Sequence, residues 1–114
     1  MDHGKLARLH GALANEVRLR VIDLVSQHNE MCLCELVDLM GMSQANLSRH
    51  VSVLRDAEIL RDRKVGTWVL LRVDEDAIRS ASAELVDRIR LHHRQSSGED
   101  AARRLEARAL CPAG

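Results

Sequence analysis

The sequence predicts a mainly α-helical winged helix-turn-helix with a small β-hairpin wing, and two stretches support this fold class. Residues 34–54 hold two amphipathic helices separated by Gly41, which suits the left-handed position after a helix, and by Ser43, which can cap the next helix. Residues 59–73 hold two β-prone runs joined by a turn at Val65-Gly66. The helix pair alone also fits an ordinary amphipathic hairpin, but the β-hairpin that follows favours a winged helix.

The second helix of the pair has the two faces expected of a helix that reads DNA. Leu47, Val51 and Leu54 recur at i, i+4 and i+7 and form one apolar stripe to bury. The opposite face has small or hydrogen-bonding side chains that can approach base edges and phosphates in a major groove. His50 either contacts phosphate or braces the helix. The residues predicted to contact DNA from this helix and its cap are Ser43, Gln44, Asn46, Ser48, Arg49, His50 and Ser52.

Basic side chains occupy the strand that approaches the tip of the predicted hairpin. They are Arg61, Arg63 and Lys64. A hairpin beside a reading helix meets the phosphate backbone, so we expect these three residues to bind the phosphates of double-stranded operator DNA. Such contacts position the protein and make its affinity salt-dependent without selecting a sequence.

The two ends of the chain predict a homodimer. With 114 residues, no Phe or Tyr and one Trp, the chain can build only a thin core, which favours further burial against a partner subunit. Amphipathic helices are expected over residues 5–14 and 74–93, and their apolar stripes suggest a seam formed by the N- and C-terminal helices. Alternatively, both helices fold back onto the domain's own core. Two-fold symmetry would place two reading helices roughly 34 Å apart on a palindromic operator.

A scaffold helix is predicted between the first helix and the helix pair. Asn15 can cap it, and it ends near His28. Its apolar stripe is predicted to use Leu19, Ile22 and either Val25 or Ser26, with Val21 and Leu24 widening the buried arc.

The domain organisation is expected to be simple. Residues 1–94 are predicted to form the DNA-binding and dimerisation domain, and residues 95–114 a C-terminal tail that carries Cys111. The net charge of zero excludes no function, because the local distribution of charge matters more than its sum for a DNA-binding protein. No apolar run approaches a membrane span and no signal peptide is recognisable, so we expect a cytoplasmic protein with no membrane partner.

Cys32 and Cys34 form a Cys-x-Cys pair at the start of the first helix of the motif. Residues two apart in a helix point about 200° from each other, so a shared ligand requires Cys32 to lie before the helix or the first turn to be distorted. Thiolate pairs select soft, thiophilic ions over hard cations. A ligand that pulled the two thiols together would move the helix that supports the reading helix. The alternative is that one or both cysteines are small buried hydrophobes.

These features resemble the ArsR/SmtB family of winged-helix metalloregulatory transcriptional repressors over residues 9–73. The resemblance rests on LANEVRLRV at 13–21, CLCEL at 32–36, SQANLSRH at 43–50 and DRKVGTWV at 62–69. It implies a homodimer that represses an operon until a metal or metalloid binds. The Cys-x-Cys before the reading helix is similar to the arsenite-sensing branch, which implies trivalent arsenic (arsenite) or antimonite as the inducer.

One position departs from that branch. Its pattern usually continues to a third cysteine three residues after the second, where this chain has Val37. Trivalent arsenic favours three sulfur ligands, and Cys111 is the only other thiol. The tail beyond Arg94 spans at most about 56 Å when extended, enough in principle to reach the cysteine pair of either subunit. We therefore hypothesise a three-sulfur site of Cys32, Cys34 and Cys111. Without Cys111, the expected inducer is a methylated trivalent arsenical, which needs only two sulfurs.

Other functions remain open on the sequence. Family members that sense zinc or cobalt use carboxylates and histidines on the last helix, where this chain has Asp87, His92 and His93, but a solvated helix end fits these residues better. A thiol-redox repressor would instead pair one of the two neighbouring cysteines with Cys111 on oxidation. A Cys-x-Cys metallochaperone would leave the basic wing unexplained. No Gly-rich phosphate loop, Cys-x-x-Cys or paired carboxylates with a nucleophile supports an enzyme.

Overall fold

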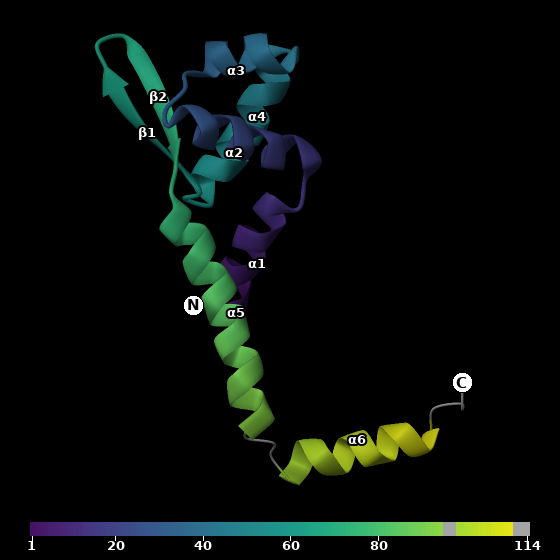
Figure 1. The fold of residues 1–114 in the computed structure, drawn as a ribbon. Helices are drawn as coiled ribbons and strands as arrows, with labels where there is room; N and C mark the ends of the chain where they lie inside the picture. The colour runs from purple at the N-terminus through teal and green to yellow at the C-terminus, as the bar shows by residue number, and fades with distance from the viewer. Residues whose placement is uncertain (95–97, 111–114) are drawn as a thin grey trace. The chain divides into compact units, whose positions relative to one another are not determined.

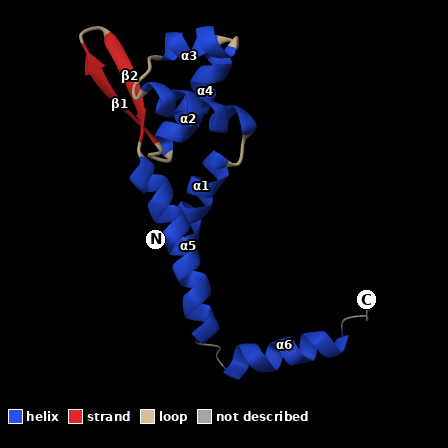
Figure 2. Ribbon diagram, viewed as in Figure 1, coloured by secondary structure: helices blue, strands red, loops and turns tan. Residues whose placement is uncertain are grey.

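The computed structural model describes residues 1–94 and 98–110 and has a mainly helical fold with one two-stranded hairpin (Figures 1 and 2). The contacts within the chain define two compact units, residues 1–82 and 83–114. The predicted division after residue 94 remains a prediction. The elements are α1 (His3–Leu13), α2 (Glu16–His28), α3 (Leu33–Met40), α4 (Gln44–Asp56), β1 (Leu60–Val65), β2 (Trp68–Val73), α5 (Glu75–Arg94) and α6 (Gly98–Leu110).

The first unit is built around one apolar core shared by its helices and the hairpin. The hairpin contacts α2, α3 and α4 (Figure 1), so the wing and the helix pair close the same core. Because the core has no aromatic side chain, aliphatic residues and methionines fill it. Its buried members are Leu6, Leu9, Ala12, Val21, Val25, Met31, Leu36, Met40, Leu47, Val51, Leu54, Ile59, Leu60, Leu71 and Ala81.

The scaffold helix α2 begins as predicted, but the face that it buries differs from the predicted apolar stripe. The Asn15 side chain caps it by accepting a hydrogen bond from the Arg18 N–H at 3.1 Å. Val21 and Val25 are fully buried, whereas the side chain of Leu19 is 51% exposed. The prediction that Leu19 belongs to the buried stripe is therefore wrong. The face of α2 that meets α4 and β2 is centred on the two valines, which turns Leu19 outward.

In the helix-turn-helix, the first helix ends and the second begins at the predicted residues. The α3 helix ends at Gly41, whose φ of 63° is left-handed and whose N–H donates to the Val37 carbonyl. Ser43 caps α4 by accepting a hydrogen bond from the Asn46 N–H at 3.2 Å. The predicted stripe of α4 is buried. The reading helix is therefore fixed to the core at its cap and along one face.

The wing is an antiparallel hairpin with a two-residue turn. Val65 pairs with Trp68, so the turn is formed by Gly66 and Thr67, one residue later than predicted. Gly66 has a φ of 62°, a conformation that glycine adopts without strain. Outside the hairpin, Met31 forms a single bridge with Leu71 of β2, in which the two residues exchange two backbone hydrogen bonds.

The α5 helix has an acidic first turn, and the residue before it caps its N-terminus. The Asp74 carboxylate accepts hydrogen bonds from the N–H groups of Asp76 and Ala77 at 3.1 and 3.3 Å. Within the second unit, several large apolar side chains of α5 are exposed, which fits the seam expected there. They are Leu85, Val86, Ile89 and Leu91. In the part of the chain that is described, no helix combines the length and apolarity needed to cross a membrane.

Candidate nucleic-acid interface and dithiol site

The outward face of α4 presents the predicted DNA-contacting side chains to solvent. Gln44, Asn46, Arg49 and Ser52 are exposed, and Ser48 is half-buried. Ser43 is also exposed, with its hydroxyl engaged as the helix cap. Within the described residues, Arg49 makes no ion pair, so its guanidinium is available to a base edge or a phosphate.

His50 has a neighbour, Arg18 of α2, that the sequence did not reveal. Its Nδ1 is 3.4 Å from Nη1 of Arg18 on α2. The same guanidinium donates to the carbonyls of Ala12 and Gly11, at 2.7 and 3.2 Å, near the end of α1. Arg18 thus links α1, α2 and α4. No periodicity marks it, because its role depends on how the turn between α1 and α2 folds. Of the two interpretations of His50, this geometry favours bracing.

Two of the three basic wing residues are already paired with carboxylates. Nε of Arg61 donates to Asp74 at 2.8 Å. Nε and Nη2 of Arg63 both donate to Glu30, each at 2.7 Å. The hydrogen bond from Arg63 lowers the pKa of the Glu30 carboxyl, and the one from Arg61 lowers the pKa of Asp74. Lys64 is exposed and, among the described residues, forms no ion pair.

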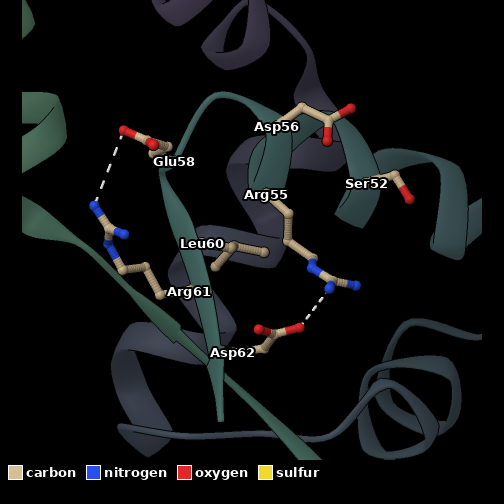
Figure 3. Close-up of a pocket in the computed structure, with 7 residues that line it drawn as sticks. All are labelled: Ser52, Arg55, Asp56, Glu58, Leu60, Arg61 and Asp62. Atoms are coloured by element: carbon tan, nitrogen blue, oxygen red, sulfur yellow. Dashed lines mark ion pairs between the residues drawn. The ribbon is translucent and has the colours of Figure 1, made fainter.

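A surface groove separates the end of α4 from β1, and charged side chains line it (Figure 3). Arg55 reaches across the groove from α4 to form an ion pair with Asp62 of β1. A longer pair of 4.0 Å joins Arg61 to Glu58. The Arg55–Asp62 ion pair therefore joins the wing to the reading helix, in addition to the contacts that both make with the apolar core.

The two neighbouring cysteines come together at the start of α3. Cys32 is the residue before the helix, with extended backbone angles of φ −86° and ψ 162°, and Cys34 lies in the first turn. This arrangement satisfies the condition that the sequence set for a shared ligand. The two Sγ atoms are 2.8 Å apart, so both can reach one soft ion. Cys32 is buried and Cys34 is exposed, so the buried-hydrophobe alternative fits only the first.

The surroundings of Cys32 keep its thiol protonated. Burial, and then the hydrogen bond with the Cys34 thiol, raise the pKa of Cys32 to about 11. The Glu35 carboxylate accepts a hydrogen bond from the Cys32 N–H at 3.0 Å, and this bond lowers the pKa of Glu35. At neutral pH the Cys32 sulfur is therefore a thiol, with the Glu35 carboxylate beside it.

Among the described residues, neither a third sulfur ligand for the cysteine pair nor the alternative metal site of histidines and carboxylates is assembled. Val37 packs against the core, and Cys111 lies outside the described residues. Asp87 is exposed, while the side chains of His92 and His93 lie outside the described ones. Within the part of the chain searched, no group of three or more histidine, cysteine or acidic side chains is arranged to hold a metal ion. The three-sulfur site remains a prediction.

Comparisons with known proteins identify the family to which the sequence is similar. The family model "Bacterial regulatory protein, arsR family" matches residues 15–62. The chain is 38% identical over 80 residues to the arsenical resistance operon repressor of Escherichia coli K12, covering 70% of this chain and 68% of that protein. It is 43% identical over 61 residues to the arsenic resistance transcriptional regulator ArsR1 of Pseudomonas putida KT2440, covering 54% and 48%.

A solved structure extends the match to the fold. It is the homodimeric winged helix-turn-helix DNA-binding domain of a possible ArsR-family regulator from Mycobacterium bovis, 28% identical, with a TM-score of 0.62 and coverage of 81% of this chain and 83% of that one. The predicted winged helix is confirmed, and the predicted absence of enzymatic function agrees with the regulators that the chain resembles. The chain therefore belongs to the ArsR family of bacterial transcriptional regulators.

Proposed function

We propose that this protein is a cytoplasmic, metalloid-responsive repressor that binds operator DNA as a homodimer and releases it when trivalent arsenic or antimony binds its cysteine thiols. The observation that carries this proposal is the 2.8 Å approach of the Cys32 and Cys34 sulfurs at the foot of α3. The relatives named as arsenic regulators support the choice of ligand class.

The DNA-binding step uses the two surfaces described above. The exposed face of α4 enters the major groove and reads base edges, and the wing meets the phosphate backbone. The apolar side chains exposed on α5, together with α1, form the subunit seam. The dimer then presents its two reading helices to two half-sites roughly one helical turn apart.

The ligand step converts thiols to arsenic–sulfur bonds. Arsenous acid exchanges each hydroxyl for one cysteine sulfur: one As–S bond forms, one As–O bond breaks, and the thiol proton leaves with the hydroxyl as water. Three exchanges would use Cys32, Cys34 and Cys111. A divalent cation must instead displace a proton from each thiol.

The coupling between ligand and DNA is reciprocal. If the ligand weakens operator binding by some factor, operator DNA weakens ligand binding by the same factor, and typical factors are about 5 to 150. The physical link is short, because the α3 helix that begins at the dithiol ends at the turn leading into the reading helix.

The test is a DNA-binding titration with DNA from upstream of the protein's own gene. Arsenite, antimonite, cadmium and zinc are added in turn, and operator release is followed by fluorescence anisotropy. Cys32→Ser should bind DNA as tightly as the parent and ignore arsenite. Cys111→Ser should lose release by arsenite but keep release by a monosubstituted trivalent arsenical. Arsenite bound stoichiometrically at the dithiol with undiminished operator occupancy would falsify the proposal.

A thiol-redox repressor of the same fold is the second candidate, since two sulfurs lie close together. The raised pKa of Cys32 disfavours Cys32 as the thiol that is oxidised, because the thiolate is the form that oxidises readily. Mass spectrometry of the peroxide-treated protein, with a parallel DNA-binding assay, separates the candidates. A disulfide to Cys111 accompanied by operator release would favour the redox function.

A further inference from the structure

The segment leading into the dithiol is fastened to the wing as well as to α3. Immediately before Cys32, Met31 exchanges two backbone hydrogen bonds with Leu71 of β2, at 3.0 and 2.7 Å. One residue earlier, Glu30 receives the two 2.7 Å hydrogen bonds from Arg63 of β1. Three consecutive residues thus contact β1, β2 and the second thiol.

We infer that Glu30 is a positioning residue that couples the dithiol to the wing, so that a ligand drawing on Cys32 also shifts Arg63. This inference rests on the proposed function, and it adds a second route from ligand to DNA besides the one through α3 and α4. In the ligand-free protein the same tie holds Arg63 at a fixed place on the hairpin.

The geometry of the tie supports transmission of movement. A bidentate pair fixes the direction of the guanidinium as well as its distance, because two parallel hydrogen bonds share one plane. Glu30 is two residues from Cys32, and the intervening Met31 is fully buried and bonded on both backbone groups. The N–H of Glu30 also donates to the His28 carbonyl at 2.8 Å. The short segment between α2 and the cysteine pair is therefore restrained by backbone hydrogen bonds.

The tie also competes with DNA for the same side chain. Arg63 is predicted to bind phosphate, yet both donors of its bidentate pair face a carboxylate that DNA would repel. Its side chain is 59% exposed, so it can exchange one anion for the other. A displaced Glu30 therefore changes where the wing presents its charge, and removing the carboxylate should not weaken ligand-free binding to DNA.

The experiment compares Glu30→Gln with Glu58→Gln. Both remove one carboxylate that pairs with a wing arginine, but Glu58 lies far along the chain from the dithiol and pairs with Arg61. The probe is phenylarsine oxide, which forms two As–S bonds, releases one water, and so needs no thiol besides Cys32 and Cys34. The measured quantity is the operator Kd with saturating probe divided by the Kd without it.

We expect the Glu30→Gln ratio to fall roughly 3- to 10-fold below that of the parent, in the range by which single residues modulate coupling. Its Kd without the probe should stay within about 3-fold of the parent or tighten, since Arg63 gains freedom to bind phosphate. Glu58→Gln should keep the parental ratio. Thiol titration confirms that every variant binds the probe, and circular dichroism confirms that every variant is folded.

A charge-exchanged variant separates coupling from mere loss of a contact. Glu30→Arg combined with Arg63→Glu restores the ion pair with reversed polarity and should recover most of the ratio, although its DNA affinity is lower. An unchanged ratio in Glu30→Gln, or an equal fall in Glu58→Gln, overturns the inference and leaves the proposed function standing. A parent protein that binds the probe at the dithiol yet holds its operator overturns the proposed function itself.

Discussion

The reading helix and the wing lie side by side, but different forces hold them. Leu47, Val51 and Leu54 of α4 are buried in the core, and the opposite face of the helix is open to solvent. Only Leu60 and Leu71 of the hairpin are buried, and most of the other hairpin side chains are exposed. Around the wing, three arginines are instead paired with carboxylates. Arg55 of α4 pairs with Asp62 of β1, Arg61 of β1 with Asp74 just after β2, and Arg63 of β1 with Glu30, which lies between α2 and α3.

This difference distinguishes two parts of the interface. The α4 helix, called the reader below, is held in a fixed position by the core, whereas the β1–β2 hairpin, called the clamp below, is held more weakly. Apolar burial does not weaken with salt, so α4 should keep its place whether or not DNA is present. The exposed ion pairs of the wing are individually weak and are screened by salt. Under the proposed function, phosphates would take over the wing arginines from their carboxylate partners. We therefore expect the wing to be the part of the interface whose position a ligand changes at the lowest cost.

The largest expected effect comes from weakening the core that holds the reader. Leu47→Ala leaves a cavity at a fully buried position and should lower the free energy of unfolding by about 2–5 kcal/mol. Val53→Ala on the exposed side of the same helix is the matched control and should change it by less than about 0.5 kcal/mol. Urea titration followed by circular dichroism measures both. Similar losses for the two variants would mean that packing does not fix α4.

The next effect concerns the open face of the reader. Arg49→Ala should weaken operator binding by about 1–3 kcal/mol if the guanidinium pairs with a guanine, with a smaller loss on scrambled DNA. Arg20→Ala, which removes an exposed arginine from α2, is the charge-matched control and should leave both affinities nearly unchanged. Anisotropy titrations of the parent and both variants on both DNAs, at one salt concentration, give the dissociation constants. Equal losses on operator and scrambled DNA would assign Arg49 to phosphate instead of base recognition.

A smaller effect tests the clamp. Lys64→Ala should weaken binding to operator and scrambled DNA alike and reduce the slope of log K against log salt by about one, as loss of one phosphate contact requires. Arg61→Ala should change the slope less, because Asp74 already neutralises Arg61 at 2.8 Å. A slope unaffected by Lys64→Ala would remove this residue from the interface.

The sequence predicted the reader better than the clamp, and the reason is physical. Helix periodicity, the left-handed Gly41 and the cap at Ser43 are local signals, and each appears in the structure where it was expected. The cysteine pair could also be judged locally, since a ligand shared by two residues requires Cys32 before the helix, where it lies.

The remaining features depend on contacts between distant parts of the chain. Leu19 has a helical spacing that fits the stripe, but the direction in which α4 and β2 approach α2 decides which face is buried. The pairing of Arg63 with Glu30 and the linkage made by Arg18 join residues about 30 positions apart. No spacing rule connects such positions, and the place of Cys111 depends on a tail that local signals do not position.

The smallest effect examines how firmly charge alone holds the wing to α4. Arg55 and Asp62 form an ion pair across the groove of Figure 3, and their side chains are 48% and 34% exposed. A double-mutant cycle with Arg55→Gln, Asp62→Asn and the combined variant should give a coupling energy of about 0.2–1 kcal/mol in urea unfolding, declining as salt increases. A coupling above about 2 kcal/mol that persists in high salt would make the wing as rigidly held as the reading helix. The clamp would then have no freedom to move, and release would have to proceed through α4 alone.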